Sequence, residues 1–374
     1  GGLTMMKTVS FRVFAAVGFV LGVAALGVVA ARVDASDVPL KALAASRTLR
    51  PDPTHTWQLV RGKHWQIAGP AGEDPAVTDA AEGTRGSCPT GMVEVAGAMK
   101  LDPPRKGKYD GNSIEDLQKR TCTKWINREY PERCAEFDRE RWLAMSADYR
   151  TKPMHFCMDR FEFPNQKGVY PIIYVNFHEA KGLCEEQGKR LCTEEEWTFA
   201  CEGEEATPYP YGYARDAEAC VIDAKWRPFN EKAMQPRDGA EAAYEMDRLW
   251  QGVPSGSSPR CKSVFGVYDM TGNVDEWTRS SVEGERPSIL KGGYWGPVRT
   301  RCRPSTRSHD ESHVFYQQGF RCCANAPVAA ASTSTDATTP ERVVPPPTSL
   351  DPSRPTSPLT PPAAAARPEA TPRP

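Results

Sequence analysis

The sequence has no excess of charge of either sign, because 47 lysines and arginines stand against 48 aspartates and glutamates, for a formal net charge of −1. It has no long basic run, which argues against a nucleic-acid partner. It also has no Cys-x-x-Cys pair, no cysteine before residue 88 and no internal repeat. These absences argue against the common zinc modules and against a repeat architecture.

The longest uncharged stretch lies close to the N-terminus. Residues 13–31 carry no charge, and they are preceded by Lys7 and Arg12. This pattern predicts, within residues 1–35, a signal peptide or an N-terminal membrane anchor, and both alternatives stay open. Either one sends the rest of the chain across the membrane. We therefore expect an exported protein on the periplasmic or cell-surface side, in contact with the membrane only if the segment stays uncleaved.

Twelve cysteines lie beyond residue 87. An even number of cysteines in an exported domain indicates disulfides, because that compartment is oxidising. The alternative is a zinc site, but Cys122 and Cys134 have no close cysteine in the sequence, and the adjacent Cys322 and Cys323 cannot easily chelate one ion. From the residues alone, pairs between Cys220 and Cys261 and between Cys157 and Cys192 are guesses.

Composition divides the chain into four parts. Residues 36–87 are rich in Ala, Gly, Pro, Asp and Thr and predict a linker, in which Trp57 and Trp65 would form at most a small local cluster. Residues 88–323 hold the apolar patterns of a folded domain. Residues 324–374 are mostly Pro, Ala, Thr and Ser, so we expect a disordered tail that acts as a spacer or as an attachment to an envelope polymer.

Local patterns in the folded part indicate short strands and two capped helices. Residues 88–95 predict a turn followed by a strand, and residues 155–163 alternate apolar and polar side chains as a second strand does. Asn176 with Glu179, and Thr193 with Glu196, form the capping-box pattern. We expect one helix through residue 186 and another that ends near residue 203.

Four sequence blocks carry a family resemblance. They are the segments 188–197 (GKRLCTEEEW), 268–277 (YDMTGNVDEW), 290–293 (LKGG) and 319–322 (GFRC). Together they resemble the formylglycine-generating enzyme, or sulfatase-modifying factor, family. The resemblance implies an α+β fold related to C-type lectins, loop-rich and stapled by disulfides. Aromatic residues inside the blocks or just after them, Trp277, Trp295 and Phe320, are predicted to lie in its core.

The resemblance also implies two disulfides and one structural calcium site. The disulfides join Cys184 to Cys322 and Cys201 to Cys302. The calcium ligands would be the side chains of Asp269 and Glu276 and the backbone carbonyls of Gly272 and Val274, hard oxygen donors of the kind calcium prefers. The alternative is an ordinary polar turn held by hydrogen bonds.

The redox chemistry of the family is missing from the pattern. Active members carry two thiols shortly after the Gly-Gly pair, where they bind copper(I), a soft ion that prefers sulfur. Here Tyr294 replaces a serine, Pro297 stands at the first thiol position, and only Cys302 remains between Gly293 and Arg321. The sequence thus predicts a domain that lacks both active-site cysteines.

Two functions follow as expectations. The first is a binding or assembly module at the cell envelope, with an unknown envelope protein or polymer as its partner. The alternative is a divergent oxidase, dependent on non-haem iron or copper, that acts on a peptide or a small thiol, and it includes residual formylglycine generation. It would use His309 and His313 or a free thiol at Cys323, since imidazole suits iron(II).

Overall fold

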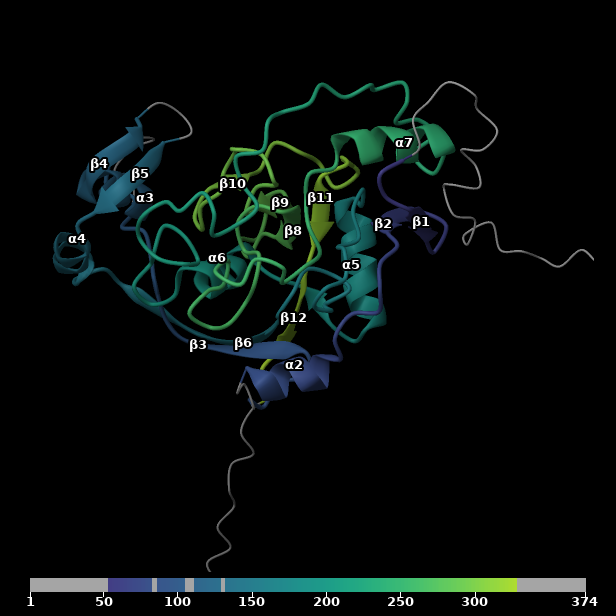
Figure 1. Cartoon of the computed structure of the whole chain (residues 1–374). Helices are drawn as coiled ribbons and strands as arrows, with labels where there is room; N and C mark the ends of the chain where they lie inside the picture. The colour runs from purple at the N-terminus through teal and green to yellow at the C-terminus, as the bar shows by residue number, and fades with distance from the viewer. Residues whose placement is uncertain (1–52, 83–85, 105–110, 129–131, 328–374) are drawn as a thin grey trace, which may run out of the picture. The chain divides into compact units, whose positions relative to one another are not determined.

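The computed structural model describes residues 53–82, 86–104, 111–128 and 132–327 (Figure 1). The apolar segment 13–31 and nearly all of the expected tail lie outside the described residues. Within the described ranges, no helix is long and apolar enough to cross a membrane.

Two four-stranded sheets form the centre of the fold. The first has the order β3-β6-β12-β7 and is antiparallel throughout. The second has the order β10-β9-β8-β11, in which β11 runs parallel to β8. Their strands are β3 (Met92–Lys100), β6 (Thr151–Asp159), β7 (Arg190–Leu191), β8 (Asp275–Arg279), β9 (Ser288–Lys291), β10 (Ser305–Thr306), β11 (Gln318–Phe320) and β12 (Cys322–Asn325).

Two helices confirm the capping patterns. In α5 (Phe177–Glu186) the side chains of Asn176 and Glu179 each accept a hydrogen bond from the other residue's backbone N–H, and Thr193 and Glu196 do the same at the start of α6 (Glu194–Glu202). The remaining helices are α2 (Pro75–Ala81), α3 (Ile114–Thr121), α4 (Arg139–Ser146) and α7 (Ala240–Leu249). The strand expected at 155–163 begins earlier and ends at Asp159.

The core packs the helices against the sheets. One cluster joins α5 to the second sheet through Leu183, Trp277 and Phe320, and another joins α6 to the first sheet through Trp197 and Met158. Trp277, Trp295 and Phe320 are all buried, which confirms their predicted place in the core. Mixed α+β architecture with long loops was the expected fold class, and it is confirmed.

The segment expected as a linker holds ordered structure from residue 53 onward. Residues 53–67, here called the strap, contain the hairpin of β1 (Trp57–Val60) and β2 (His64–Ile67). Trp57 and Trp65 are only 1% and 3% exposed. Their indole N–H groups donate to Asp247 Oδ1 (3.0 Å) and to the Arg237 carbonyl (2.7 Å). Burial of two indoles outweighs the polar composition of the segment, and Figure 1 shows the strap beside α7.

All twelve cysteines are described, and all form disulfides. The pairs are Cys88–Cys157, Cys122–Cys134, Cys184–Cys322, Cys192–Cys323, Cys201–Cys302 and Cys220–Cys261. Both pairs implied by the resemblance are confirmed, and so is Cys220 with Cys261.

The guess that joined Cys157 to Cys192 is wrong. Cys157 lies opposite Ala324 in the β6–β12 ladder, so it shares a face of the sheet with Cys322. Cys323 points to the other face because successive side chains of a strand alternate, and Cys192 bonds to Cys323 there. Cys157 instead bonds to Cys88.

Candidate functional site

The loop that follows β9 begins with a tight turn. Gly293 has a φ of +69°, and a Cβ atom at this position would lie 2.0 Å from the Val298 carbonyl oxygen. Only glycine fits so close an approach of two backbone segments. Pro297 lies inside this turn, at the position where active relatives of the resembled family carry a thiol.

Aromatic side chains fill the space beside this loop. Trp295 is 2% exposed and packs edge-on against Trp250, with ring centroids 4.8 Å apart. Trp250 contacts Trp57 of the strap in the same manner at 5.8 Å, and Tyr316 also lies against Trp295. The loop is therefore part of a buried aromatic cluster that α7 and the strap complete.

The two cysteines with a conceivable catalytic role are both in disulfides. Cys302, the next cysteine after the loop, bonds to Cys201, and Cys323 bonds to Cys192. The free thiol that the oxidase alternative places at Cys323 is therefore contradicted. A disulfide sulfur is neither the nucleophile nor the copper ligand that a thiolate provides.

After the loop, the chain carries four arginines, Arg299, Arg301, Arg303 and Arg307, here called the arginine row. Each pairs with at least one carboxylate. The N···O distances are 2.5 Å from Arg299 to Asp275, 3.2 Å from Arg301 to Glu115, 2.5 Å from Arg303 to Glu202 and 3.1 Å from Arg307 to Glu285.

Two clefts flank the arginine row. The smaller has a volume of 190 Å³ and is lined by Arg299 and Arg301, and the larger has a volume of 440 Å³ and is lined by Arg303 and Arg307. Glu115 of α3 lines both. The smaller cleft is also lined by Lys119 of α3 and by Glu132, which precedes β5 (Arg133–Phe137), the partner of β4 (Cys122–Asn127) in a hairpin.

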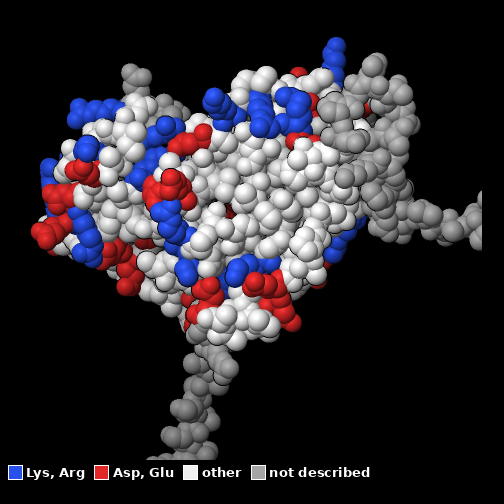
Figure 2. Space-filling model, in the orientation of Figure 1, with Lys and Arg blue, Asp and Glu red and all other residues white. Residues whose placement is uncertain are grey.

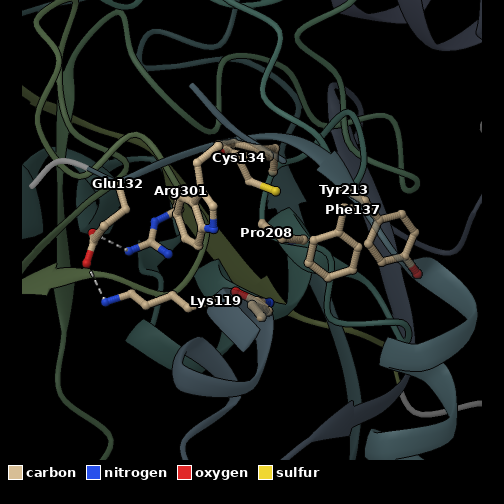
Figure 3. A pocket seen from close by; sticks show the side chains of 10 residues that line it. Lys119, Glu132, Cys134, Phe137, Pro208, Tyr213 and Arg301 are labelled. Atoms are coloured by element: carbon tan, nitrogen blue, oxygen red, sulfur yellow. Dashed lines mark ion pairs between the residues drawn. The ribbon is translucent and has the colours of Figure 1, made fainter. Parts of the chain in front are cut away.

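Charges alternate in sign across these clefts. Figure 3 shows Glu132 at one end of a neighbouring pocket, where it pairs with Lys119 at 2.7 Å and with Arg301 at 3.8 Å, and the aromatic rings of Phe137 and Tyr213 at the other end. Figure 2 shows the same mixture over the α3 and α4 side of the molecule, whereas the centre of that face carries few charged side chains. The region is charged without being strongly acidic or basic.

Within the arginine row, Arg303 and its partner Glu202 are largely buried. Burial raises the pKa of Glu202, although its partner Arg303 opposes the shift. Lys291 lies in the same layer and donates from Nζ to the Arg303 carbonyl at 2.7 Å. Burial lowers the pKa of this lysine to about 8, with Glu194 and Glu115 acting in the opposite direction.

The two histidines of the oxidase alternative do meet in space. The rings of His309 and His313 stack face to face with centroids 3.8 Å apart. The pKa of His313 is lowered, mainly by burial and secondly by the neighbouring His309. Across the described ranges, no set of three or more His, Cys, Asp or Glu side chains is placed to hold a metal ion. Stacking directs the ring faces, not the nitrogen lone pairs, toward each other.

The four predicted calcium ligands lie in one buried segment, 269–276, whose last two residues begin β8 and in which Asp269 and Gly272 have positive φ angles. Glu276 accepts from Arg321 at both oxygens, at 2.6 and 2.7 Å, and from the Trp197 indole at 2.8 Å. Asp269 accepts from the Gly256 N–H at Oδ2 (2.7 Å). Hydrogen bonds therefore occupy both oxygens of Glu276. The four predicted ligands fit calcium only in part, and the calcium site stays a prediction.

A second carboxylate near Asp269 was missed from the sequence. Glu162 follows β6, is fully buried and accepts from Ser255 Oγ and Asn273 Nδ2, both at 2.7 Å. The pKa of Glu162 is raised well above the usual value, mainly by burial and further by the nearby carboxylates of Asp269 and Glu276. Burial also raises the pKa of Asp269 to about 7. A glutamate at an inward position of the alternating segment 155–163 is the one signal that could have revealed it.

Comparison with known proteins agrees with this architecture. The profile of the sulfatase-modifying factor enzyme 1-like domain matches residues 123–326. The inactive C-alpha-formylglycine-generating enzyme 2 of Bos taurus is 29% identical over 43% of this chain and 52% of its own length. Hercynine oxygenase of Mycobacterium tuberculosis is 27% identical over 40% of this chain and 35% of its own length.

Among solved structures, PvdO from Pseudomonas aeruginosa superposes with a TM-score of 0.37 at 17% identity, over 64% of this chain and 95% of PvdO. The chain spans about half the length of the curated relative from Bos taurus. The family profile covers more than half of the present chain, and its match includes the blocks from 188–197 to 319–322. The chain therefore belongs to the family of sulfatase-modifying factor enzyme 1-like domains.

Proposed function

We propose that this protein is an exported binding or assembly module of the cell envelope that keeps the family scaffold without its oxidase chemistry. The observation that carries the proposal is the state of the loop after β9. Pro297 lies in a turn closed by Gly293, and the nearest cysteine downstream, Cys302, is bonded to Cys201. Thiolate chemistry has no thiol to act with at this place. The similarity to a protein named as an inactive enzyme supports the same conclusion.

The clefts beside the arginine row are the proposed binding surface. Arg307 keeps 47% of its side chain exposed while it pairs with Glu285 and Glu194. Exposed ion pairs of this kind contribute little to stability, so a ligand carboxylate can replace the internal partner at small cost. Arginine also binds carboxylates through two parallel hydrogen bonds. An extended envelope polypeptide with charged side chains fits such a surface.

The first experiment tests the chemistry. The full chain is produced in an oxidising compartment, unfolded and titrated for thiols, and the folded protein is incubated with a Cys-x-Pro-x-Arg peptide and analysed by mass spectrometry. We expect no free thiol and no formylglycine. Formylglycine in the peptide would overturn the proposal.

The same preparation tests the oxidase alternative, which the similarity to hercynine oxygenase and the meeting of His309 with His313 favour. The iron and copper content of the wild-type protein is compared with that of the variant His309→Ala. Stoichiometric iron or copper that is lost in this variant would make the protein a divergent oxidase in place of a binding module.

The second experiment tests the surface. A photo-crosslinking residue replaces Lys119 in the smaller cleft and, as a control, Val77, an exposed residue of α2. We expect a discrete adduct with an envelope component in living cells from position 119 only. Equal adducts from both positions, or none from position 119, would place the binding surface elsewhere.

A further inference from the structure

Two arginines share a single carboxylate oxygen beside the smaller cleft. Arg215, which lines this cleft, lies 2.7 Å from Asp223 Oδ1 through Nη2, and Arg133 lies 2.8 Å from the same oxygen. Arg215 Nη1 donates to Thr300 Oγ1 at 2.9 Å. Among the described residues, Nε of each of these two arginines is buried and meets no hydrogen-bond acceptor. A buried donor without an acceptor costs free energy, so the fold satisfies these two guanidinium groups only in part.

Arg301 lines the same cleft and has only distant internal partners. Its side chain is 15% exposed, yet the closest carboxylate oxygens lie 3.2 Å away on Glu115 and 3.8 Å away on Glu132. Within the described part of the chain, Nη2 donates to Glu115, and no hydrogen bond occupies Nε or Nη1. Glu132 is held more closely by Lys119, at 2.7 Å. The planar fork of Arg301 is therefore open to an acceptor in the cleft.

The charges around the smaller cleft do not balance. In the described ranges, five basic side chains pair with four carboxylates there: Lys119, Arg133, Arg215, Arg299 and Arg301 with Glu115, Glu132, Asp223 and Asp275. Arg299 is matched by Asp275, whereas Arg133 and Arg215 have Asp223 between them. With all groups ionised, one positive charge is left over, and a partly buried charge without a partner is unfavourable.

A carboxylate group from outside the fold matches this surplus. It carries one negative charge, and its two oxygens accept the parallel N–H groups of a guanidinium. A phosphate group would bring about two negative charges near neutral pH and reverse the imbalance. The volume of the cleft, 190 Å³, is enough for one carboxylate with the first atoms of its chain, since a water molecule takes about 30 Å³.

We propose that the smaller cleft binds one carboxylate group of a polypeptide, between Arg301 and Arg215. This proposal rests on the proposed function, because it names the chemical group that this part of the binding surface takes. It differs from the exchange of partners at Arg307. At the smaller cleft the carboxylate displaces no internal ion pair and instead supplies the one negative charge that the fold lacks.

The test is a titration of the full chain with acetate at constant ionic strength. The chain carries isotope-labelled arginine, and NMR follows the Nε–H groups. We expect saturable shifts of the Arg215 and Arg301 signals with acetate and none with acetamide, its neutral counterpart. The midpoint of thermal unfolding should rise over the same concentrations, because a ligand of the folded state stabilises it.

Two short peptides then distinguish the sources of the carboxylate. The first has blocked ends and one aspartate, and the second has no acidic side chain but a free C-terminal carboxylate. Both should shift the same signals, and the peptide that binds more tightly identifies the source as an acidic side chain or as a chain end. Binding of neither peptide would contradict a polypeptide ligand.

Two variants should change the affinity for acetate in opposite directions. Arg301→Gln removes the open guanidinium, so the affinity should fall about tenfold, the effect of one charge-assisted hydrogen bond. Glu132→Gln removes a competing carboxylate from the same cleft, so the affinity should rise, and a misfolded variant could not produce this gain. Arg260→Gln is the matched control, because Arg260 is an exposed arginine that pairs with Asp216, and it should leave the affinity unchanged.

Three results would overturn the proposal: no saturable shift with acetate, equal shifts with acetamide, or tighter binding of inorganic phosphate than of acetate. The crosslinking experiment fails independently of this one. An adduct from position 119 without acetate binding would keep the binding surface and reject the carboxylate. Acetate binding without an adduct would keep the carboxylate site and reject the envelope partner.

Discussion

Trp295 packs edge-on against Trp250 with ring centroids 4.8 Å apart, and this contact ties the loop after β9 to the segment that follows α7. Trp250 also meets Trp57 of the strap. The loop that is reactive in active relatives of the family is thus covered by two elements that lie outside the four signature blocks. A change in the strap should therefore be felt at the loop.

Asp247 of α7 fixes the strap and gives the first prediction. Its carboxylate accepts from the backbone N–H groups of Thr54 (2.7 Å) and His55 (3.0 Å) and from the indole of Trp57. In Asp247→Asn, one carboxylate oxygen becomes an amide NH2 group, a hydrogen-bond donor that faces the N–H donors of the strap. We therefore expect a loss of about 2–3 kcal/mol in the free energy of unfolding. Amide hydrogen exchange at residues 54–57 should accelerate more than elsewhere.

The control for the strap prediction is Asp238→Asn, which changes an exposed carboxylate of the neighbouring chain segment. It should leave both stability and exchange unchanged. Equal effects of the two variants would show that Asp247 does not anchor the strap.

Gly293 gives a second prediction, because its Cβ position is blocked. Gly293→Ala places a methyl group 2.0 Å from a carbonyl oxygen, so the turn must open, and we expect a loss above about 3 kcal/mol. Gly284→Ala is the matched control, since Gly284 has a φ of +83° but no atom within 4 Å of its Cβ position. It should lose only about 1 kcal/mol, the conformational part alone. Urea unfolding measures both, and equal losses would contradict the close approach.

His64 predicts how stability changes with pH. Burial lowers its pKa from 6.5 to about 4, although Glu179 opposes the shift, while Arg237, Lys63 and Arg61 reinforce it. Between these two values the unfolded chain binds a proton that the folded chain does not, so acidification favours unfolding. The stability should be complete above pH 6.5 and fall by roughly 3 kcal/mol as the pH reaches 4.

Other groups also titrate in this range, so the measurement compares the wild type with His64→Gln at each pH. The difference in unfolding free energy between the two proteins should shrink from pH 7 to pH 4. A difference that does not change with pH would mean that His64 is accessible to protons in the folded protein.

The parts of the fold that depend on residues close together in the sequence could be predicted. The helices α5 and α6 follow from capping residues three positions apart, and the family resemblance supplied the two pairs Cys184–Cys322 and Cys201–Cys302. Cys157 could not be paired correctly without knowing that β6 lies against β12, since that pairing decides which face its side chain takes.

The strap was missed for a different reason. Its composition is that of a linker, and only the spacing of Trp57 and Trp65 on either side of a turn at Arg61 and Gly62 marks a hairpin with both indoles inward. The site was harder still. Arg303 and Glu202 are 101 residues apart in the chain, and Glu162 meets Asp269 only through folding, so no local pattern predicts these contacts.

The disulfides differ in the loop that each one closes, and this difference gives the last prediction. Cys184–Cys322 spans 138 residues, whereas Cys122–Cys134 spans 12 within the β4–β5 hairpin. In the chain-entropy description, replacing both cysteines of the long pair with alanine should cost about 4–5 kcal/mol, and the same change in the short pair about 3 kcal/mol. The long pair also joins α5 to β12 inside the core, where truncation leaves a cavity. Chemical unfolding of the two double variants should therefore give the larger loss for Cys184 and Cys322. The opposite order would show that the β4–β5 hairpin contributes more to the stability than its short loop implies.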